Sequence, residues 1–580
     1  MERVRRASGV RWAFLVGLVV AVAAIPSAAG FEREGREVPQ GLLGHVSQVV
    51  AARYYAHHPQ QAPAAVARGL AQVHEGDDDD AGDGDGHGGS GFCESGSSND
   101  VFNCDDIGFP QNEESVGVCP TNTKYVLQGT NDYRGVLEPP FNTTGWHWST
   151  DRGHSVDNEG FLPSVAVDPT AFPNHDDLPS GGDPVDFIPA GCDSVYAASL
   201  AYNADNPFGD ANGIAVYKTT PAILSSCGGG NDPSCWPVRR LVAQTDEAFF
   251  NDKEWMFVGN QNGTRYVWVT YSEFAQDKTK PIGYSAVKIR AVRCDANLAT
   301  CTPPMDISTV DQDVQFSDVT VGPDGRAYIT WARIDGELPG TPEGDPGQPQ
   351  TFTIKIRVET APGSGVFGPE HVVAVEDQPI PFGGFLQAND FRVATYPKSD
   401  VAMVVGQPRI FVIWDACRFR LFDTTCEKPA IKLAYSLDPN GAAWSEPTFI
   451  SHGGVNYFPT ISADRSLKTN RLVASWFTNQ YDPAFENEQD VVLTAIRPGS
   501  GRARGLKRLT SPSNESEADP LLGGFFIGDY IEAVLVKEKA WVGYNANYRK
   551  VQVLGVSGAP FDEGFRINQQ DNYLAVTVTD

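Results

Sequence analysis

Residues 252–259 read DKEWMFVG, and residues 265–274 read RYVWVTYSEF. Both segments are rich in aromatic and β-branched residues, a composition typical of buried β-strands. A turn of a few residues separates them. Together the two segments predict a β-hairpin, and comparable pairs recur along most of the chain.

The first segment of each pair begins at residues 112, 162, 252, 316, 391, 458 and 528, a mean spacing of about 69 residues. Two further strand-like runs follow most pairs, for example GIAVYKTT and WPVRRLVA. Four strands per unit at a long period predict an all-β fold, a β-propeller of about seven four-stranded blades. Six or eight blades remain alternatives, because the two ends of a chain often share a closing blade, and an array of β-sandwiches is the alternative fold.

The 580 residues include 45 Lys and Arg and 73 Asp and Glu, which gives a net charge of −28. This excess of negative charge argues against a nucleic-acid partner, because phosphate binding requires clustered cations. We expect instead a glycan or an extracellular protein as partner, and a monomer.

The N-terminal region has a different composition. Residues 1–29 contain arginines, an apolar run and small residues before Gly30, the pattern of a secretory signal peptide. The apolar run is shorter than the roughly 20 residues of a membrane-spanning helix, so an uncleaved anchor is the weaker alternative. We expect residues 30–75 to form a helical pro-segment or spacer, residues 76–92 an acidic, glycine-rich linker, and residues 93–580 the propeller. The protein is therefore predicted to be secreted, extracellular or periplasmic, without stable membrane insertion after cleavage.

Ten cysteines in an exported chain indicate disulfides. Four pairs are close in sequence, and Cys119 and Cys192 are left to pair with each other, although spacing alone does not prove connectivity. No Cys-x-x-Cys spacing occurs, so zinc is not expected. We expect no cofactor, with loop-bound calcium as an alternative. The four close pairs are Cys93/Cys104, Cys227/Cys235, Cys294/Cys301 and Cys417/Cys426.

Two outer hairpins carry a further motif. Ser149-x-Asp151-x-Gly153 matches the start of the Asp-box turn, and residues 436–444, SLDPNGAAW, match it with one inserted residue. Glycine supplies the positive φ of such a turn, and Asp and Ser can bind its amides. With the repeated strands, these motifs make residues 112–558 resemble the secreted sialidase-like (BNR/Asp-box) propellers. The resemblance implies a propeller that acts on glycans, and its most specific implication is an exo-sialidase.

In a propeller, the starts of the inner strands and the ends of the second strands meet around the axis on one face, where ligands usually bind. This geometry selects two groups of polar residues. The strand starts supply Glu113, Asp252, Glu254, Asp318, Asp390, Arg392, Asp529 and Tyr530, and the strand ends supply Asp132, Arg134, Glu273, Arg333, Asp335, Asp415, Arg418, Tyr481, Tyr548 and Arg549.

The resemblance implies roles for six of these residues. Tyr530 would be the nucleophile, Glu254 its partner and Asp132 the acid/base, because a neutral nucleophile avoids repulsion by an anionic sugar. A clamp of arginines would hold the substrate carboxylate; it would consist of Arg134, Arg392 and Arg549. Two alternatives remain open: a non-catalytic extracellular propeller that binds a glycan or protein, and a polysaccharide lyase.

Overall fold

The structure is a computed structural model. It describes residues 50–51, 55, 93–94, 99–103 and 109–579, except 137–138, 171, 173–175, 204–207, 209–210, 281–282, 310–312, 336–350, 378–388, 390, 419, 422–424, 427, 486, 516–525 and 553–565. Every described residue belongs to the unit that spans residues 38–580.

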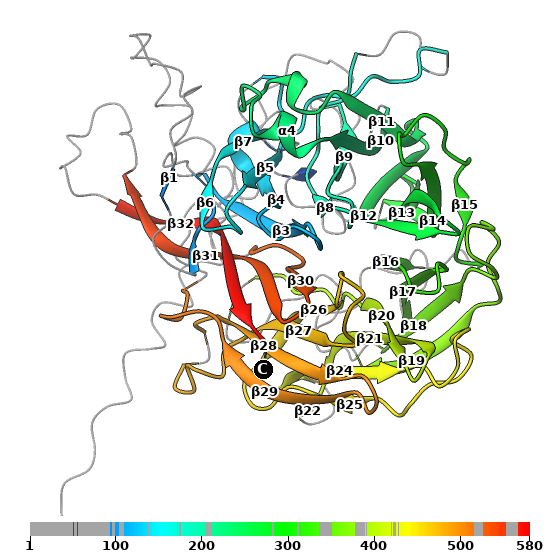
Figure 1. Cartoon of the computed structure of the whole chain (residues 1–580), viewed down its shortest axis with the longest axis vertical. Coiled ribbons are helices and arrows are strands. Elements are labelled where there is room, and N and C mark those ends of the chain that lie inside the picture. The colour runs from blue at the N-terminus through cyan, green and yellow to red at the C-terminus, as the bar shows by residue number, and fades with distance from the viewer. Residues whose placement is uncertain are drawn as a thin grey trace, which may run out of the picture. The chain divides into compact units, whose positions relative to one another are not determined.

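Seven four-stranded antiparallel sheets form the blades of a β-propeller (Figure 1). The first three blades are β3 (Gln111–Val118), β4 (Val126–Asp132), β5 (Thr144–Ser149) and β7 (Asn158–Phe161); β8 (Val185–Phe187), β9 (Val195–Tyr202), β10 (Asn212–Thr219) and β11 (Val238–Thr245); and β12 (Phe249–Gln261), β13 (Thr264–Gln276), β14 (Tyr284–Asp295) and β15 (Met305–Asp306). The next three are β16 (Val314–Val321), β17 (Ala327–Asp335), β18 (Thr351–Val358) and β19 (His371–Asp377); β20 (Lys398–Val404), β21 (Gln407–Cys417), β24 (Pro429–Tyr435) and β25 (Thr448–Phe449); and β26 (Asn456–Ala463), β27 (Leu472–Thr478), β28 (Asp490–Arg497) and β29 (Arg502–Arg508). Short two-stranded pairs join β1 (Cys93–Glu94) to β6 (Ser155–Val156) and β22 (Arg420–Leu421) to β23 (Thr425–Cys426).

The seventh blade closes the ring with strands from both ends of the described chain. It contains β30 (Glu532–Val536), β31 (Lys539–Gln552), β32 (Arg566–Val578) and, outermost, β2 (Asn99–Val101). Each inner strand contacts the inner strand of the next blade, and β30 contacts β3. The sequence prediction of a seven-bladed propeller is therefore confirmed, and the closing blade is shared between the two ends.

Two inner strands differ in position from the sequence prediction. The segment from Leu162 makes only an isolated bridge, and the second blade begins instead with β8. The segment from Phe391 precedes β20, which starts immediately after Pro397. Proline accounts for the first difference, because it lacks an N–H for the strand ladder. Pro163 lies inside the first segment and Pro397 ends the second.

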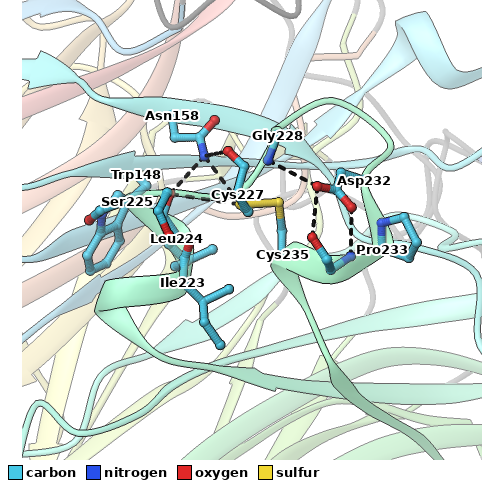
Figure 2. Close-up of a disulfide and its surroundings, with 12 residues drawn as sticks. Trp148, Asn158, Ile223, Leu224, Ser225, Cys227, Gly228, Asp232, Pro233 and Cys235 are labelled. Carbon is cyan, nitrogen blue, oxygen red and sulfur yellow. Dashed lines mark hydrogen bonds between the residues drawn. A yellow bond between two sulfur atoms is a disulfide. The ribbon is translucent and has the colours of Figure 1, made fainter.

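Four disulfides join the predicted partners: Cys119–Cys192, Cys227–Cys235, Cys294–Cys301 and Cys417–Cys426. Cys104, the predicted partner of Cys93, lies outside the described residues. In the connection between β10 and β11, the Cys227–Cys235 bond joins the turn after α4 (Pro221–Leu224) to η3 (Pro233–Cys235) (Figure 2). Asp232 caps η3 by accepting a hydrogen bond from the Ser234 amide at 2.9 Å. Disulfides in this number are typical of extracellular proteins.

The two predicted turns contain the hydrogen bonds expected from their sequences. Asp151 accepts hydrogen bonds from the amides of His154 and Ser155, both at 3.0 Å, and Gly153 has φ +85°. In the second turn, Asp438 accepts from the Asn440 amide at 2.8 Å, and Gly441 has φ +74°. These side chains hold the turns closed, so their role is structural.

The predicted helical segment is described only at residues 50, 51 and 55, all of them helical. Val50 and Ala51 are buried in the same apolar cluster as strands of the second to fifth blades. The predicted signal peptide and linker lie outside the described residues. In the part of the chain that the structure describes, no helix combines the length and apolarity required to cross a bilayer.

Candidate functional site

Four inner strands share a bulge near their first residues, at the end of the propeller axis where we predicted the site. The pairing register shifts within β3, β12, β16 and β26, and each shift contains a non-glycine residue with φ between +49° and +61°. These residues are Glu113, Lys253, Phe316 and Phe458. A bulge re-aims side chains that regular alternation would place on the opposite face. Two of the four bulge residues, Glu113 and Lys253, meet at the axis.

Lys253 is the centre of a buried charged cluster. Its Nζ lies 2.5 Å from Asp529 Oδ2, 3.3 Å from Asp183 Oδ2 and 3.8 Å from Glu113 Oε1. All four side chains are no more than 1% exposed. Burial alone would lower the pKa of Lys253, but the charges of Asp183, Asp529 and Glu113 outweigh burial and raise it well above its ordinary value. The lysine is therefore held as a cation.

Arg392 brings a second cation to the cluster from the segment before β20. Its Nε and Nη2 donate to the two oxygens of Asp529 at 3.1 and 2.5 Å, a bidentate pair. Burial would raise the pKa of Asp529, but the charges of Arg392 and Lys253 dominate and lower it. Asp529 is therefore an ionised carboxylate in a buried place.

Asp252 and Glu254 flank Lys253 on β12, and their pKa values are raised, unlike that of Asp529. Both are buried, and their carboxyl oxygens have no hydrogen-bond partner among the described residues. Burial, reinforced by the charges of Asp183 and Asp529 and opposed by Lys253, raises the pKa of Asp252 to about 8. The pKa of Glu254 is raised well above its ordinary value by burial and then by the charge of Asp183. At neutral pH, Asp252 is held mainly in its protonated form.

Aromatic rings and a second buried lysine adjoin the carboxyl groups. Tyr530 meets Trp255 edge to face, with ring centroids 5.6 Å apart, and its hydroxyl donates to the Pro184 carbonyl at 3.0 Å. Lys398 Nζ lies over the rings of Trp255, Tyr396 and Tyr530, at 2.7, 4.0 and 5.4 Å from the centroids. Burial lowers the pKa of Lys398 to about 7, and its Nζ has no hydrogen-bond partner among the described residues.

The six residues assigned from the resemblance occupy different places. Tyr530, Glu254 and Arg392 share the axial cluster: the charge of Glu254 is among those that raise the pKa of Tyr530, and Arg392 binds Asp529. Asp132 and Arg134 bind each other through the guanidinium, and the Gln111 amide also donates to Asp132 at 3.1 Å. The side chain of Arg549 lies outside the described residues.

Three residues of the cluster were not predicted: Lys253, Asp183 and Lys398. Regular alternation in β12 gave no reason to select Lys253, because the bulge between Asp252 and Trp255 is not visible in the sequence. Asp183 and Lys398 belong to the two blades whose inner strands we misplaced. The sequence did contain a signal for Lys253. Three consecutive charged residues, DKE at 252–254, open a segment that a buried strand would fill with apolar residues.

The raised pKa of Asp252 gives a testable effect on stability. In the unfolded chain its carboxyl ionises near the ordinary value of 3.8, whereas in the folded chain it keeps its proton up to about pH 8. Between these values the folded state binds more protons, so this residue lowers the free energy of unfolding as pH rises. We expect Asp252→Asn, which cannot ionise, to be more stable than the wild type at pH 8, by at least about 1 kcal/mol, and to lose this advantage near pH 4. Chemical denaturation at both pH values measures the difference, and a constant difference would contradict the assignment.

A separate pocket lies nearer the other ends of the inner strands. Its lining includes residues 116–118 and 186–188, Arg465 and Glu532. Arg465 pairs there with Asp400 at 3.4 Å. Burial raises the pKa of both Asp186 and Glu532, so neither is favoured as an ionised nucleophile. We therefore place the candidate site at the axial cluster. Among the described residues, no three His, Cys, Asp or Glu side chains are arranged to hold a metal ion.

The fold and cluster define a seven-bladed propeller with a charged, buried axis. No protein-family model and no curated protein matches its sequence. Among solved structures, the endosialidase of phage phi92 is 8% identical, with 83% of this chain and 69% of the other covered and a TM-score of 0.40. An ulvan lyase described as a new polysaccharide lyase family, PL25, is 9% identical over 77% and 92% of the two chains, with a TM-score of 0.40. The Trypanosoma rangeli sialidase is 9% identical over 73% and 56%, with a TM-score of 0.36.

Proposed function

We propose that this chain is a secreted, glycan-acting propeller and that its axial cluster hydrolyses glycosidic bonds. The observation that carries the proposal is the contrast between two neighbouring carboxyl groups. The carboxyl oxygens of Asp252 are buried without a hydrogen-bond partner among the described residues, and burial raises its pKa to about 8. Asp529 is paired with Lys253 and Arg392, and their charges lower its pKa. Surroundings that push two carboxyl pKa values apart provide the acid and the nucleophile of glycoside hydrolysis.

Asp529 attacks the anomeric carbon as the bond to the leaving oxygen breaks, and Asp252 gives its proton to that oxygen. Asp252, now ionised, then takes a proton from water, and the resulting hydroxide displaces Asp529 from the sugar. A carboxylate of lowered pKa suits the first role because it leaves readily in the second step. Lys253 and Arg392 hold it in place, and the nearby rings of Trp255 and Tyr530 suit an apolar sugar face.

This assignment differs from the one implied by the resemblance. Burial and the charges of Glu113, Asp183 and Glu254 raise the pKa of Tyr530 well above its ordinary value, which disfavours the phenolate that a tyrosine nucleophile requires. Asp132 forms its ion pair with Arg134, whereas the axial cluster is built around Lys253 and Arg392. We therefore propose Asp252 as the acid and Asp529 as the nucleophile, with Tyr530 and Glu254 lining the substrate site.

The test is hydrolysis of a panel of chromogenic glycosides, neutral sugars, uronides and sialosides, by the full secreted chain. We expect turnover of at least one member and its loss in Asp252→Asn. A folded protein that hydrolyses none of them would favour the non-catalytic alternative, a propeller that binds glycans or proteins.

A further inference from the structure

The outer edge of the sixth blade is basic in an otherwise acidic protein. Residues 491–514 contain five Lys and Arg and no Asp or Glu, although the whole chain has 73 acidic residues against 45 basic ones. One of these cations, Arg497, ends β28, and the other four lie on β29. β29 is the outermost strand of its sheet, on the lower side of the propeller in Figure 1. We call Arg497, Arg502 and Arg504 the basic stripe.

No described residue neutralises the basic stripe. All three side chains are exposed, and none makes an ion pair with a described residue. Arg497 and Arg502 are direct cross-strand partners, a position where two like charges destabilise a hairpin. Arg508, further along β29, differs because it pairs with Asp490 at 2.8 Å. The charges of the basic stripe therefore do not stabilise the fold through ion pairs with described residues.

A neighbouring blade adds an arginine and an aromatic ring beside the stripe. Arg409 Nη1 donates to the carbonyls of Pro498 and Gly499 at 3.2 and 3.3 Å, and its guanidinium lies 5.0 Å from the centroid of the Tyr435 ring. The turn packs directly on this ring, because a Cβ added at Gly501 would be 2.7 Å from Tyr435 Cδ1. Guanidinium groups beside an aromatic face match the acidic groups and apolar faces of charged sugars.

We propose that the basic stripe is a binding site for a linear anionic polysaccharide, one that carries carboxylates or sulfates. Arg502 and Arg504 are two residues apart on one strand, about 7 Å, and so offer regularly spaced forks to successive acidic sugars. The site is one strand wide, which suits a single glycan chain. A nucleic-acid duplex or a membrane presents a broad anionic surface, which the net charge of −28 would repel. The site is distinct from the axial cluster and does not depend on its chemistry.

The test compares two triple variants of the full secreted chain by fluorescence anisotropy with labelled polymers. The first is Arg497→Gln, Arg502→Gln and Arg504→Gln. The matched control, Lys124→Gln, Lys468→Gln and Lys539→Gln, removes the same charge from exposed, scattered positions. Melting curves and turnover of small chromogenic glycosides establish that both variants are folded and that the axial cluster is unaffected.

We expect the wild type to bind polygalacturonate, dextran sulfate or both at about 50 mM salt, but not neutral dextran. The stripe variant should raise the dissociation constant at least about tenfold, and the control should change it less than about twofold. Binding to carboxylated or sulfated polymer alone would identify which acidic group is recognised. Equal losses in the two variants, no binding by the wild type, or equally tight binding of duplex DNA would each overturn the proposal.

Discussion

Replacing Asp252 with Asn should lower kcat/KM about 10³-fold on glycosides with poor leaving groups. The amide has the same shape but no proton to donate to the departing oxygen. Glycosides whose leaving group needs no protonation, such as dinitrophenyl glycosides, should be cleaved at close to the wild-type rate, at least in the first step. Steady-state kinetics on such a pair of substrates measures the loss and separates missing acid catalysis from general damage.

Asp415→Asn is the matched control for this variant. Asp415 is also fully buried, and burial raises its pKa to about 7. It accepts a hydrogen bond from Thr395 at 3.3 Å and takes no part in the proposed mechanism. We expect its kcat/KM to stay near the wild-type value on both substrates. Equal losses in the two variants, or a loss in Asp252→Asn that ignores the leaving group, would rule out Asp252 as the acid.

Replacing Lys253 with Met should destabilise the protein by about 3–5 kcal/mol. The ammonium lies within 4 Å of Asp529, Asp183 and Glu113. Its removal takes this cation from Asp183 and Glu113, whereas Asp529 keeps its pair with Arg392. Guanidinium-induced unfolding at pH 7 measures the change. Part of the loss should be recovered at lower pH, where those carboxylates accept protons.

Lys398→Met provides the comparison: both lysines are buried on inner strands, but among the described residues only Lys253 forms ion pairs. Lys398 Nζ has no hydrogen-bond partner among the described residues, and burial lowers its pKa to about 7. Its removal should therefore cost much less than removal of Lys253. It should stabilise the protein at pH values below the ordinary lysine pKa of 10.5, and most strongly at pH 7 and below, because the folded state no longer has to bury or neutralise a cation. A similar loss from both substitutions would show that side-chain volume, rather than charge pairing, determines the effect.

The architecture could be predicted from the sequence because each blade repeats the same hydrophobic pattern. An error in one blade therefore does not change the predicted fold. The second and fifth inner strands were misplaced: Pro163 interrupts the first of these two segments, and β20 begins only after Pro397. Five members of the axial cluster, Glu113, Asp252, Glu254, Arg392 and Asp529, were predicted because they stand near the starts of inner strands.

Lys253 and Asp183, which contact these residues, could not be predicted, and the reason is physical. Lys253 reaches the axis only through a bulge with φ +54°, and Asp183 has φ +53° in the connection before β8. Neither conformation follows from side-chain patterning. The pKa contrast between Asp252 and Asp529 depends on which of them Lys253 and Arg392 contact, and that pairing exists only in the folded chain.

Trapping the glycosyl-enzyme intermediate tests the carboxyl mechanism most directly. A 2-deoxy-2-fluoro glycosyl fluoride, matched to the sugar that the panel identifies, should slow both steps and leave the sugar covalently attached. Tandem mass spectrometry must resolve adjacent residues, because Asp529 and Tyr530 lie in one peptide. We expect the sugar on Asp529, with labelling slowed in Asp529→Asn. Attachment to Tyr530, or inactivation without any adduct in the residues of the axial cluster, would contradict the assignment of Asp529 as the nucleophile.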